Sequence, residues 1–189
     1  ETLSRVTDYT DRGSCILFGD GASAAVLSPC AEGFGLLGYS MESFGQHGGC
    51  LALPAGGSRL RLTPELLATH QDCIFMQGHE VYKLAVRGCQ DIAAEVLQKV
   101  GMTADQVDLW VPHQANLRII EAAVKRFNVT PEKVLINLDR YGNTSAASIG
   151  IALDEYKRNH GIAAGAVVML VGFGAGFSLA AALIRWGAA

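Results

Sequence analysis

The chain has 189 residues, enough to bury a core as one domain or as a large part of one. Half of the residues are hydrophobic, 17% are charged and the formal net charge is -3, so the composition gives no global argument for binding nucleic acid or a membrane surface. The cysteines number five and form no Cys-x-x-Cys pair, which argues against a zinc site or a disulfide framework and favours a reducing compartment.

Glycine turns and short apolar runs predict mainly strands in the first third of the chain. Residues 14–18 predict a strand, residues 19–21 a turn, and residues 22–27 a second strand of small side chains. A further strand is predicted over residues 35–42. Glycine pairs and a proline predict a loop over residues 45–61.

Helical and strand patterns alternate in the middle of the chain. Apolar residues at helical spacing predict the helices, and short apolar runs predict the strands. The predicted order is helix 78–100, strand 107–111, helix 116–127, a turn at residues 130–131 and strand 134–136.

The last part of the chain predicts a helix over residues 144–159 and two strands, 167–171 and 177–184, around the glycine-rich turn 172–176. Strands that alternate with helices pair in parallel, whereas two strands joined only by a glycine turn are antiparallel. The sequence therefore predicts a layered α/β fold with a mostly parallel sheet and an antiparallel edge.

A short internal repeat links the two ends of the chain. Residues 18–25 (FGDGASAA) align with residues 173–180 (FGAGFSLA) at Phe, both Gly, Ser and Ala. One interpretation is a duplicated fold, in which residues 1–30 are the final strands of a first half and residues 31–189 form a second half. The alternative is chance similarity between two turns rich in Gly and Ala.

No run of residues is long and apolar enough to predict a transmembrane helix, because residues 162–186 are interrupted by glycines, a serine and an arginine. The first residue is Glu1 rather than methionine, and no secretory leader is recognised. We therefore expect a processed or truncated N-terminus.

His113 follows the predicted strand 107–111 and precedes a helix. Ligands of open α/β sheets bind at the carboxyl ends of strands, where an imidazole can donate a hydrogen bond to a developing negative charge. Asn143 follows the neighbouring strand 134–136 and offers amide N–H groups that cannot ionise. The alternatives are a structural histidine, and an asparagine or Thr144 that only caps the next helix.

The turn at residues 172–176 can bring backbone N–H groups close to a substrate. Because a strand rather than a long helix follows it, we do not expect it to bind a nucleotide.

A nucleophile is missing from these candidate site residues. Neither a Gly-x-Ser-x-Gly elbow nor a cysteine with a basic neighbour or a clear helix N-terminus is found; the cysteines are Cys15, Cys30, Cys50, Cys73 and Cys89.

Four stretches together resemble the β-ketoacyl-acyl-carrier-protein synthase III enzymes of the thiolase superfamily. They are DRGSCILFGDGASAAVL, VPHQANLRII, YGNTSAASIGIALDE and GFGAGFSLAAALIRW. The resemblance implies a layered α/β/α/β/α sandwich, of which this chain would be the C-terminal half plus the last hairpin of the N-terminal half. It also implies a homodimer in the cytoplasm or in the plastid stroma.

The resemblance implies a decarboxylative Claisen condensation that initiates fatty acid synthesis. A short acyl group moves from coenzyme A to a cysteine, and malonyl-acyl-carrier-protein then loses CO2 and attacks it. Coenzyme A enters as a thioester substrate, and neither a metal nor another cofactor is expected. The family's cysteine would precede Glu1, so we expect this chain alone to be inactive.

The resemblance also assigns roles to individual residues. His113 and Asn143 match the pair that stabilises the enolate oxygen. The loop that closes the site and supplies an oxyanion hole matches Phe173, Gly174 and Ala175. Positions near the pantetheine arm match Gly78, Tyr82 and Asn116.

Basic residues on two predicted helices form a local positive cluster in an acidic chain: Lys83, Arg87, Arg118, Lys125 and Arg126. Carrier proteins are acidic, so this cluster is a candidate docking surface; the alternative is a solvated helix face.

Two alternative functions stay open for the chain. One is a non-catalytic partner subunit, against which the intact His113 and Asn143 argue, and the other is a starter enzyme of polyketide or secondary metabolism.

Overall fold

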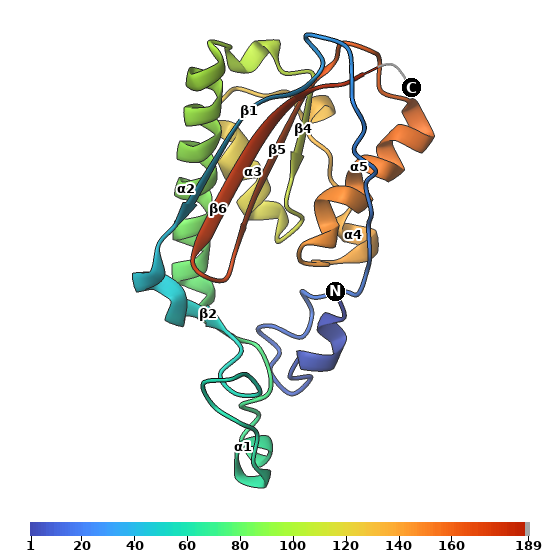
Figure 1. Ribbon diagram of the computed structural model, residues 1–189. Helices are drawn as coiled ribbons and strands as arrows, with labels where there is room; N and C mark the ends of the chain where they lie inside the picture. Colours follow the sequence, from blue (N-terminus) through green and yellow to red (C-terminus); the bar gives the residue numbers. More distant parts are fainter. Residues whose placement is uncertain (188–189) are drawn as a thin grey trace.

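A four-stranded sheet forms the centre of the computed structural model, which describes residues 1–187 (Figure 1). Its strand order is β1 (Gly35–Ser43), β6 (Ser178–Arg185), β5 (Val167–Gly174) and β4 (Leu109–Pro112). β4 and β5 pair in parallel, whereas β6 is antiparallel to both of its neighbours. Only one of the three strand pairs is parallel, so the prediction of a mostly parallel sheet with an antiparallel edge is wrong. The hairpin after β5 turns β6 back inside the sheet, between β5 and β1, and not onto its edge.

Helices cover both faces of this sheet. α2 (Gly78–Val100) and α3 (Leu117–Lys125) lie on one face and α5 (Ala147–His160) on the other (Figure 1). Residues alternate between the faces of a strand. Trp110 and Met169 therefore pack in the cluster with α2 and α3, whereas Leu109 and Val168 pack with α5. The result is the α/β/α layering that the sequence predicts.

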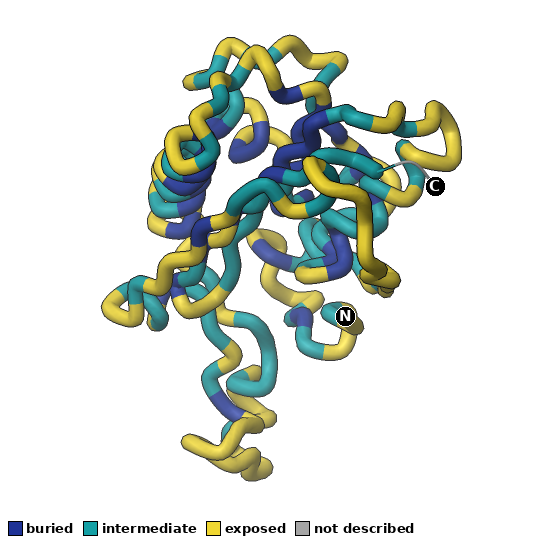
Figure 2. Tube along the Cα trace, turned by 45° about the horizontal axis from the view of Figure 1, so that its top comes forward, coloured by how far each residue is buried: buried dark blue, intermediate teal, exposed yellow. Residues whose placement is uncertain are grey.

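α2 spans the residues that its apolar spacing predicts and ends at Gly101, whose φ of 72° suits glycine. One side of this helix is buried, through Val81, Ala85, Cys89, Ile92, Ala93, Val96 and Leu97. Figure 2 shows the buried residues gathered in the strands and along the inner side of the helices. Burial of this apolar face is the main source of stability for such a helix.

An arm projects from the sheet between β1 and α2 (Figure 1). It contains a two-stranded sheet, β2 (Leu51–Ala52) with β3 (Phe75–Met76), and the short helix α1 (Pro64–Ala68). The predicted loop 45–61 is confirmed only for residues 53–61, because a short 3-10 helix and β2 occupy residues 45–52. The remaining short helical segments are η1 (Leu3–Val6), η2 (Gly45–Cys50), η3 (Ala104–Gln106), η4 (Pro131–Lys133) and α4 (Leu138–Tyr141).

Three predicted strands do not form within residues 1–187. Residues 12–17 make turns, in which the Asp11 carboxylate accepts from the Gly13 N–H and the Ser14 hydroxyl. Residues 22–27 are exposed and have no strand beside them to complete a ladder. Residues 134–136 contribute one bridge, between Val134 and Trp110. A strand pattern needs a hydrogen-bonding neighbour, and the sequence pattern carries no information about that neighbour.

The N-terminal segment is hydrogen-bonded to the turn that precedes α5. Phe18 and Asn143 form a parallel bridge, in which Gly19 N–H donates to the Asn143 carbonyl at 2.9 Å and Asn143 N–H donates to the Leu17 carbonyl at 2.8 Å. A Cβ atom at Gly19 would collide with the backbone carbonyl oxygen of Tyr141. Only glycine fits at this approach.

We predict that Gly19→Ala lowers the free energy of unfolding by about 1–3 kcal/mol, because the collision is with backbone that cannot rotate away. Urea denaturation measures this change. Gly49→Ala is the matched control, since a Cβ atom there meets nothing within 4 Å. Equal stability of the two variants would show that residues 17–19 do not hold the turn at Asn143.

Candidate active site

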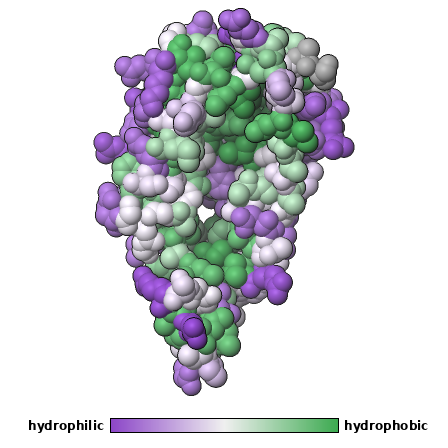
Figure 3. Space-filling model, viewed as in Figure 1, coloured by the Kyte–Doolittle hydropathy of each residue, from purple (hydrophilic) through white to green (hydrophobic). Residues whose placement is uncertain are grey.

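A cavity of about 510 Å³ lies where β4 and β5 end, between the body and the arm. Figure 3 shows the molecule hollowed there, with apolar side chains around the opening. Its volume is typical of small-molecule sites. The predicted catalytic, loop and substrate-arm residues all line it: His113, Asn143, Phe173, Gly174, Ala175, Gly78, Tyr82 and Asn116. None of the predicted docking residues does.

His113 follows β4 directly and is fixed on both sides. Its backbone N–H donates to the Val171 carbonyl of β5 at 2.8 Å, which extends the parallel ladder by one residue. The ring nitrogen Nδ1 lies 2.7 Å from the Ser148 hydroxyl of α5, and the Phe173 ring packs edge-on at 5.2 Å between centroids. Burial lowers the pKa of His113 to about 4, so the ring is neutral at pH 7.

Asn143 is fixed through its own turn as well as through residues 17–19. Its side-chain oxygen Oδ1 accepts from the Ser145 N–H at 2.9 Å, which leaves the amide nitrogen Nδ2 on the other side. α5 begins after Ala146 without a side-chain cap, so neither Asn143 nor Thr144 is its N-cap. Asn116, by contrast, caps α3 by accepting from the Arg118 N–H at 2.9 Å, a role that sequence reasoning missed.

Two side-chain nitrogen atoms, His113 Nε2 and Asn143 Nδ2, are left free at this cavity. Among residues 1–187 the only buried side-chain polar atoms without a hydrogen bond are Trp110 Nε1 and Thr144 Oγ1. Neither His113 Nε2 nor Asn143 Nδ2 has a hydrogen-bond partner in the same part of the chain, so both atoms must be accessible. Both residues line the same cavity, so the two nitrogens belong to one candidate site.

The fully buried Gln114 joins the elements that carry these donors. Its Nε2 donates to the carbonyls of Pro112 at 2.8 Å and Leu135 at 3.1 Å, and its Oε1 accepts from the Asn137 N–H at 3.0 Å. The side chain therefore makes the bonds that the missing strand 134–136 would have made. The sequence interpretation gave Gln114 no role. Its side-chain amide both donates and accepts, so a glutamine between a histidine and the start of a helix can bond to backbone on both sides.

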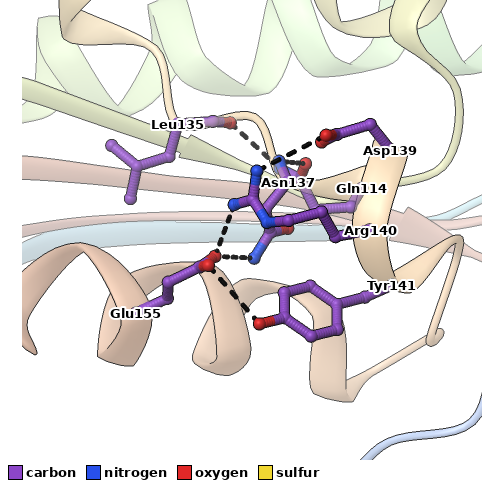
Figure 4. A network of polar contacts seen from close by, with 7 residues as sticks. All are labelled: Gln114, Leu135, Asn137, Asp139, Arg140, Tyr141 and Glu155. Atoms are coloured by element: carbon purple, nitrogen blue, oxygen red, sulfur yellow. Dashed lines mark hydrogen bonds and ion pairs between the residues drawn. The ribbon is translucent and has the colours of Figure 1, made fainter. Parts of the chain in front are cut away.

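A carboxylate continues this network toward α5 (Figure 4). Glu155 accepts from Asn137 Nδ2 and Arg140 Nη2, both at 2.9 Å, and from the Tyr141 hydroxyl at 3.4 Å. The hydrogen bond from Arg140 contributes most to lowering the pKa of Glu155, and the Asn137 and Tyr141 hydrogen bonds lower it further. The network thus ties the segment before Asn143 to the helix that follows it.

The predicted docking residues are all exposed and lie on the outer sides of α2 and α3. Three of them already have acidic neighbours. Lys83 pairs with Glu80 at 3.1 Å, and both Arg87 and Arg126 pair with Asp91, at 3.6 Å and 2.7 Å. Within residues 1–187, Arg118 and Lys125 have no ion pair, so they are the better candidates for contacting another acidic molecule.

No cysteine lines the 510 Å³ cavity. Cys89 lies in the core, where burial raises its pKa to about 12, and burial also raises the pKa of Cys73. These thiols do not ionise near pH 7 and are poor nucleophiles. Within residues 1–187 no group of three His, Cys, Asp or Glu side chains could hold a metal ion, and no helix is both long and apolar enough to cross a bilayer.

Family models, curated relatives and solved structures all match this chain to the same family. The model of 3-oxoacyl-[acyl-carrier-protein] synthase III matches residues 1–45, and the model of its C-terminal part matches residues 97–186. A β-ketoacyl-[acyl-carrier-protein] synthase III of Caldanaerobacter subterraneus is 48% identical over 98% of this chain and 56% of its own length.

Solved structures agree with the sequence matches. The synthase III of Thermus thermophilus superposes with a TM-score of 0.87 at 40% identity, over 99% of this chain and 57% of that one. The priming β-ketosynthase of the R1128 polyketide pathway superposes with a TM-score of 0.76 at 30% identity, over 98% and 55%.

These matches confirm the predicted thiolase-like α/β fold. The chain spans a little over half the length of the curated relatives it matches. With both family models matched along the chain and the fold shared throughout, this chain belongs to the β-ketoacyl-acyl-carrier-protein synthase III family.

Proposed function

We propose that these residues supply the decarboxylation site of a condensing enzyme. The enzyme joins a short acyl group, delivered by coenzyme A, to malonyl-acyl-carrier-protein and thereby starts fatty acid synthesis. The observation that carries the proposal is that His113 Nε2 and Asn143 Nδ2 have no hydrogen-bond partner among residues 1–187 while both residues line one cavity; in the proposal both nitrogens donate. Names of the relatives support the substrate class, since they are synthases acting on acyl-carrier-protein thioesters.

Decarboxylation of a malonyl thioester places negative charge on the thioester oxygen as the enolate forms. Two fixed donors stabilise that charge without having to reorganise, and a partly buried site strengthens each bond. Because burial keeps the His113 ring neutral, the charge is met by dipoles rather than by a cation. Gly78, Tyr82 and Asn116 line the same cavity, where they hold the pantetheine arm.

The loop after β5 completes this site. Gly174 pairs with Ser178 across the hairpin, so Phe173, Gly174 and Ala175 stay at the cavity wall. In this proposal their backbone presents an N–H to the second oxyanion, which forms when the enolate attacks the acyl-cysteine. In this proposal the cysteine nucleophile is none of the five cysteines present, which is supported by their absence from the cavity lining.

A starter enzyme of polyketide synthesis is the second candidate, favoured by the likeness to the R1128 priming β-ketosynthase. It would use the same decarboxylation chemistry with a different acyl primer. Comparing condensation rates with acetyl-CoA and with longer or branched acyl-CoA primers separates the two candidates. A non-catalytic subunit is the weaker alternative, since it has no use for two donors directed into a cavity.

We predict that His113→Ala, in the polypeptide that carries the cysteine as well, lowers the rate of malonyl decarboxylation by about 10²- to 10³-fold, the usual loss for one oxyanion donor. Transfer of the acyl group onto the cysteine should change far less. Release of CO2 from labelled malonyl thioester and single-turnover acylation measure the two steps.

The 189 residues by themselves serve as the control, since they should form no ketoacyl product from acetyl-CoA and malonyl-carrier protein. Product formation by this segment alone would refute the external nucleophile. Equal losses in acylation and decarboxylation would show that His113 is only a scaffold.

The low pKa of His113 also predicts a pH dependence of stability. Its folded pKa of about 4 lies below the ordinary value of 6.5, so between these two the unfolded chain binds more protons. Stability is therefore full above pH 6.5 and falls as the pH drops, by up to about 1.4 kcal/mol per pH unit from this residue. Urea denaturation at about pH 7 and pH 5 should show a smaller difference in His113→Gln than in wild type.

His160→Gln, a change at an exposed histidine on α5, is the control and should keep the wild-type difference. An unchanged difference in His113→Gln would mean that the ring is not desolvated.

The docking part of the proposal predicts a substrate-dependent effect. Arg118→Glu should raise KM for malonyl-carrier protein by roughly 5- to 20-fold, because a charge at the edge of an interface mainly changes the rate at which an acidic partner associates. Its effect with malonyl-CoA should be small, and the carrier effect should shrink at high salt. Arg158→Glu, on the exposed side of α5, is the control. Similar losses with carrier and with coenzyme A substrates would rule out docking at α3.

A further inference from the structure

Ser148 lies in the first turn of α5, is 2% exposed and contacts the candidate site through a single hydroxyl. That Oγ has two neighbours. It accepts from the Gln114 backbone N–H at 3.1 Å and lies 2.7 Å from Nδ1 of His113. The hydroxyl is thus placed between the backbone that follows His113 and the ring of His113 itself.

The proton positions in this trio follow from what each group can do. A backbone N–H only donates, so Ser148 Oγ is an acceptor toward Gln114. If Nδ1 also donated, the hydroxyl proton of Ser148 would have no acceptor among residues 1–187, and a buried donor without a partner destabilises the folded state. If the hydroxyl donates to Nδ1 instead, every polar group of the trio is satisfied.

We propose that Ser148 is a positioning residue that holds the neutral His113 ring in the tautomer with its proton on Nε2. A neutral imidazole has one N–H, and the nitrogen that Ser148 leaves protonated is the one that reaches the cavity. In the other tautomer, Nε2 would direct a lone pair at an incoming oxygen and repel it. The catalytic consequence rests on the proposed function, whereas the tautomer itself does not.

One turn therefore orients both donors of the site. Ser148 N–H donates to the Ser145 carbonyl at 3.1 Å, and Ser145 N–H fixes the Asn143 side-chain oxygen at 2.9 Å. The segment from Asn143 to Ser148 thus directs the Asn143 amide nitrogen into the cavity and, through Ser148, sets which nitrogen of His113 is protonated. Residues 143–148 (NTSAAS) therefore determine both the direction of the Asn143 amide and the tautomer of His113.

Nitrogen NMR of the full-length polypeptide, labelled with ¹⁵N-histidine and free of substrate, tests the tautomer directly. The His113 signals are those lost in His113→Gln. In wild type, Nδ1 should give the shift of an unprotonated ring nitrogen and Nε2 that of a protonated one. In Ser148→Ala, both signals should move toward a mixture of tautomers, and Ser148→Thr, which retains the hydroxyl, should restore the wild-type pattern.

Ser40→Ala is the matched control, because it removes another buried serine hydroxyl, bonded to Glu95 and away from the cavity. It should leave the His113 signals unchanged. An Nδ1-protonated ring in wild type overturns the proposal even if Ser148→Ala does not fold. An unchanged Nε2–H ring in a folded Ser148→Ala overturns it as well.

Activity gives an independent measurement. Ser148→Ala should lower the decarboxylation rate by about 10- to 100-fold with little change in KM, and Ser148→Thr should recover most of it. A correct tautomer in an enzyme without condensing activity would refute the proposed function and leave this inference intact.

Discussion

The side chain of Gln114 holds together the two turns on which the site depends. β4 ends at Pro112, and the segment that follows Val134 does not continue as a ladder beside it. The Gln114 amide makes the three missing bonds, to the carbonyls of Pro112 and Leu135 and to the N–H of Asn137. Without them, two carbonyls and an N–H would be left unpaired in the interior, each at a cost of about 1–3 kcal/mol.

The site combines rigid supports with uncharged donors. His113 is held by a ladder bond, a serine hydroxyl and a phenylalanine edge, and Asn143 by its own turn and a bridge to residues 17–19. Burial lowers the pKa of His113 to about 4, which keeps the ring neutral. Dipoles fixed in this way need no rearrangement when charge develops nearby, which is what the proposed stabilisation of an enolate requires.

Much of this arrangement could be predicted from the sequence. The apolar spacing and terminal glycine predict α2 to the residue. The sequence also predicts that His113 and Asn143 lie together, because each follows a predicted strand, and both line one cavity although residues 134–136 form only a single bridge. The strands predicted at residues 14–18, 22–27 and 134–136 were wrong, because strand formation depends on a hydrogen-bonding neighbour that the local pattern does not identify. The supports supplied by Gln114 and Ser148 were also missed, since they depend on which atoms meet across the fold.

The bridge between Phe18 and Asn143 has a consequence for how the protein folds. It joins residues that are far apart in the sequence, whereas β5 and β6 pair through a short hairpin. Contacts of large sequence separation must overcome a greater loop-closure entropy, so they form later than local ones. We therefore expect the hairpin of β5 and β6 to form early. The turn of Asn143 should lock late, as should the pairing of β1 with β6, which joins residues still farther apart. The cavity that His113 and Asn143 line would then be completed late in folding.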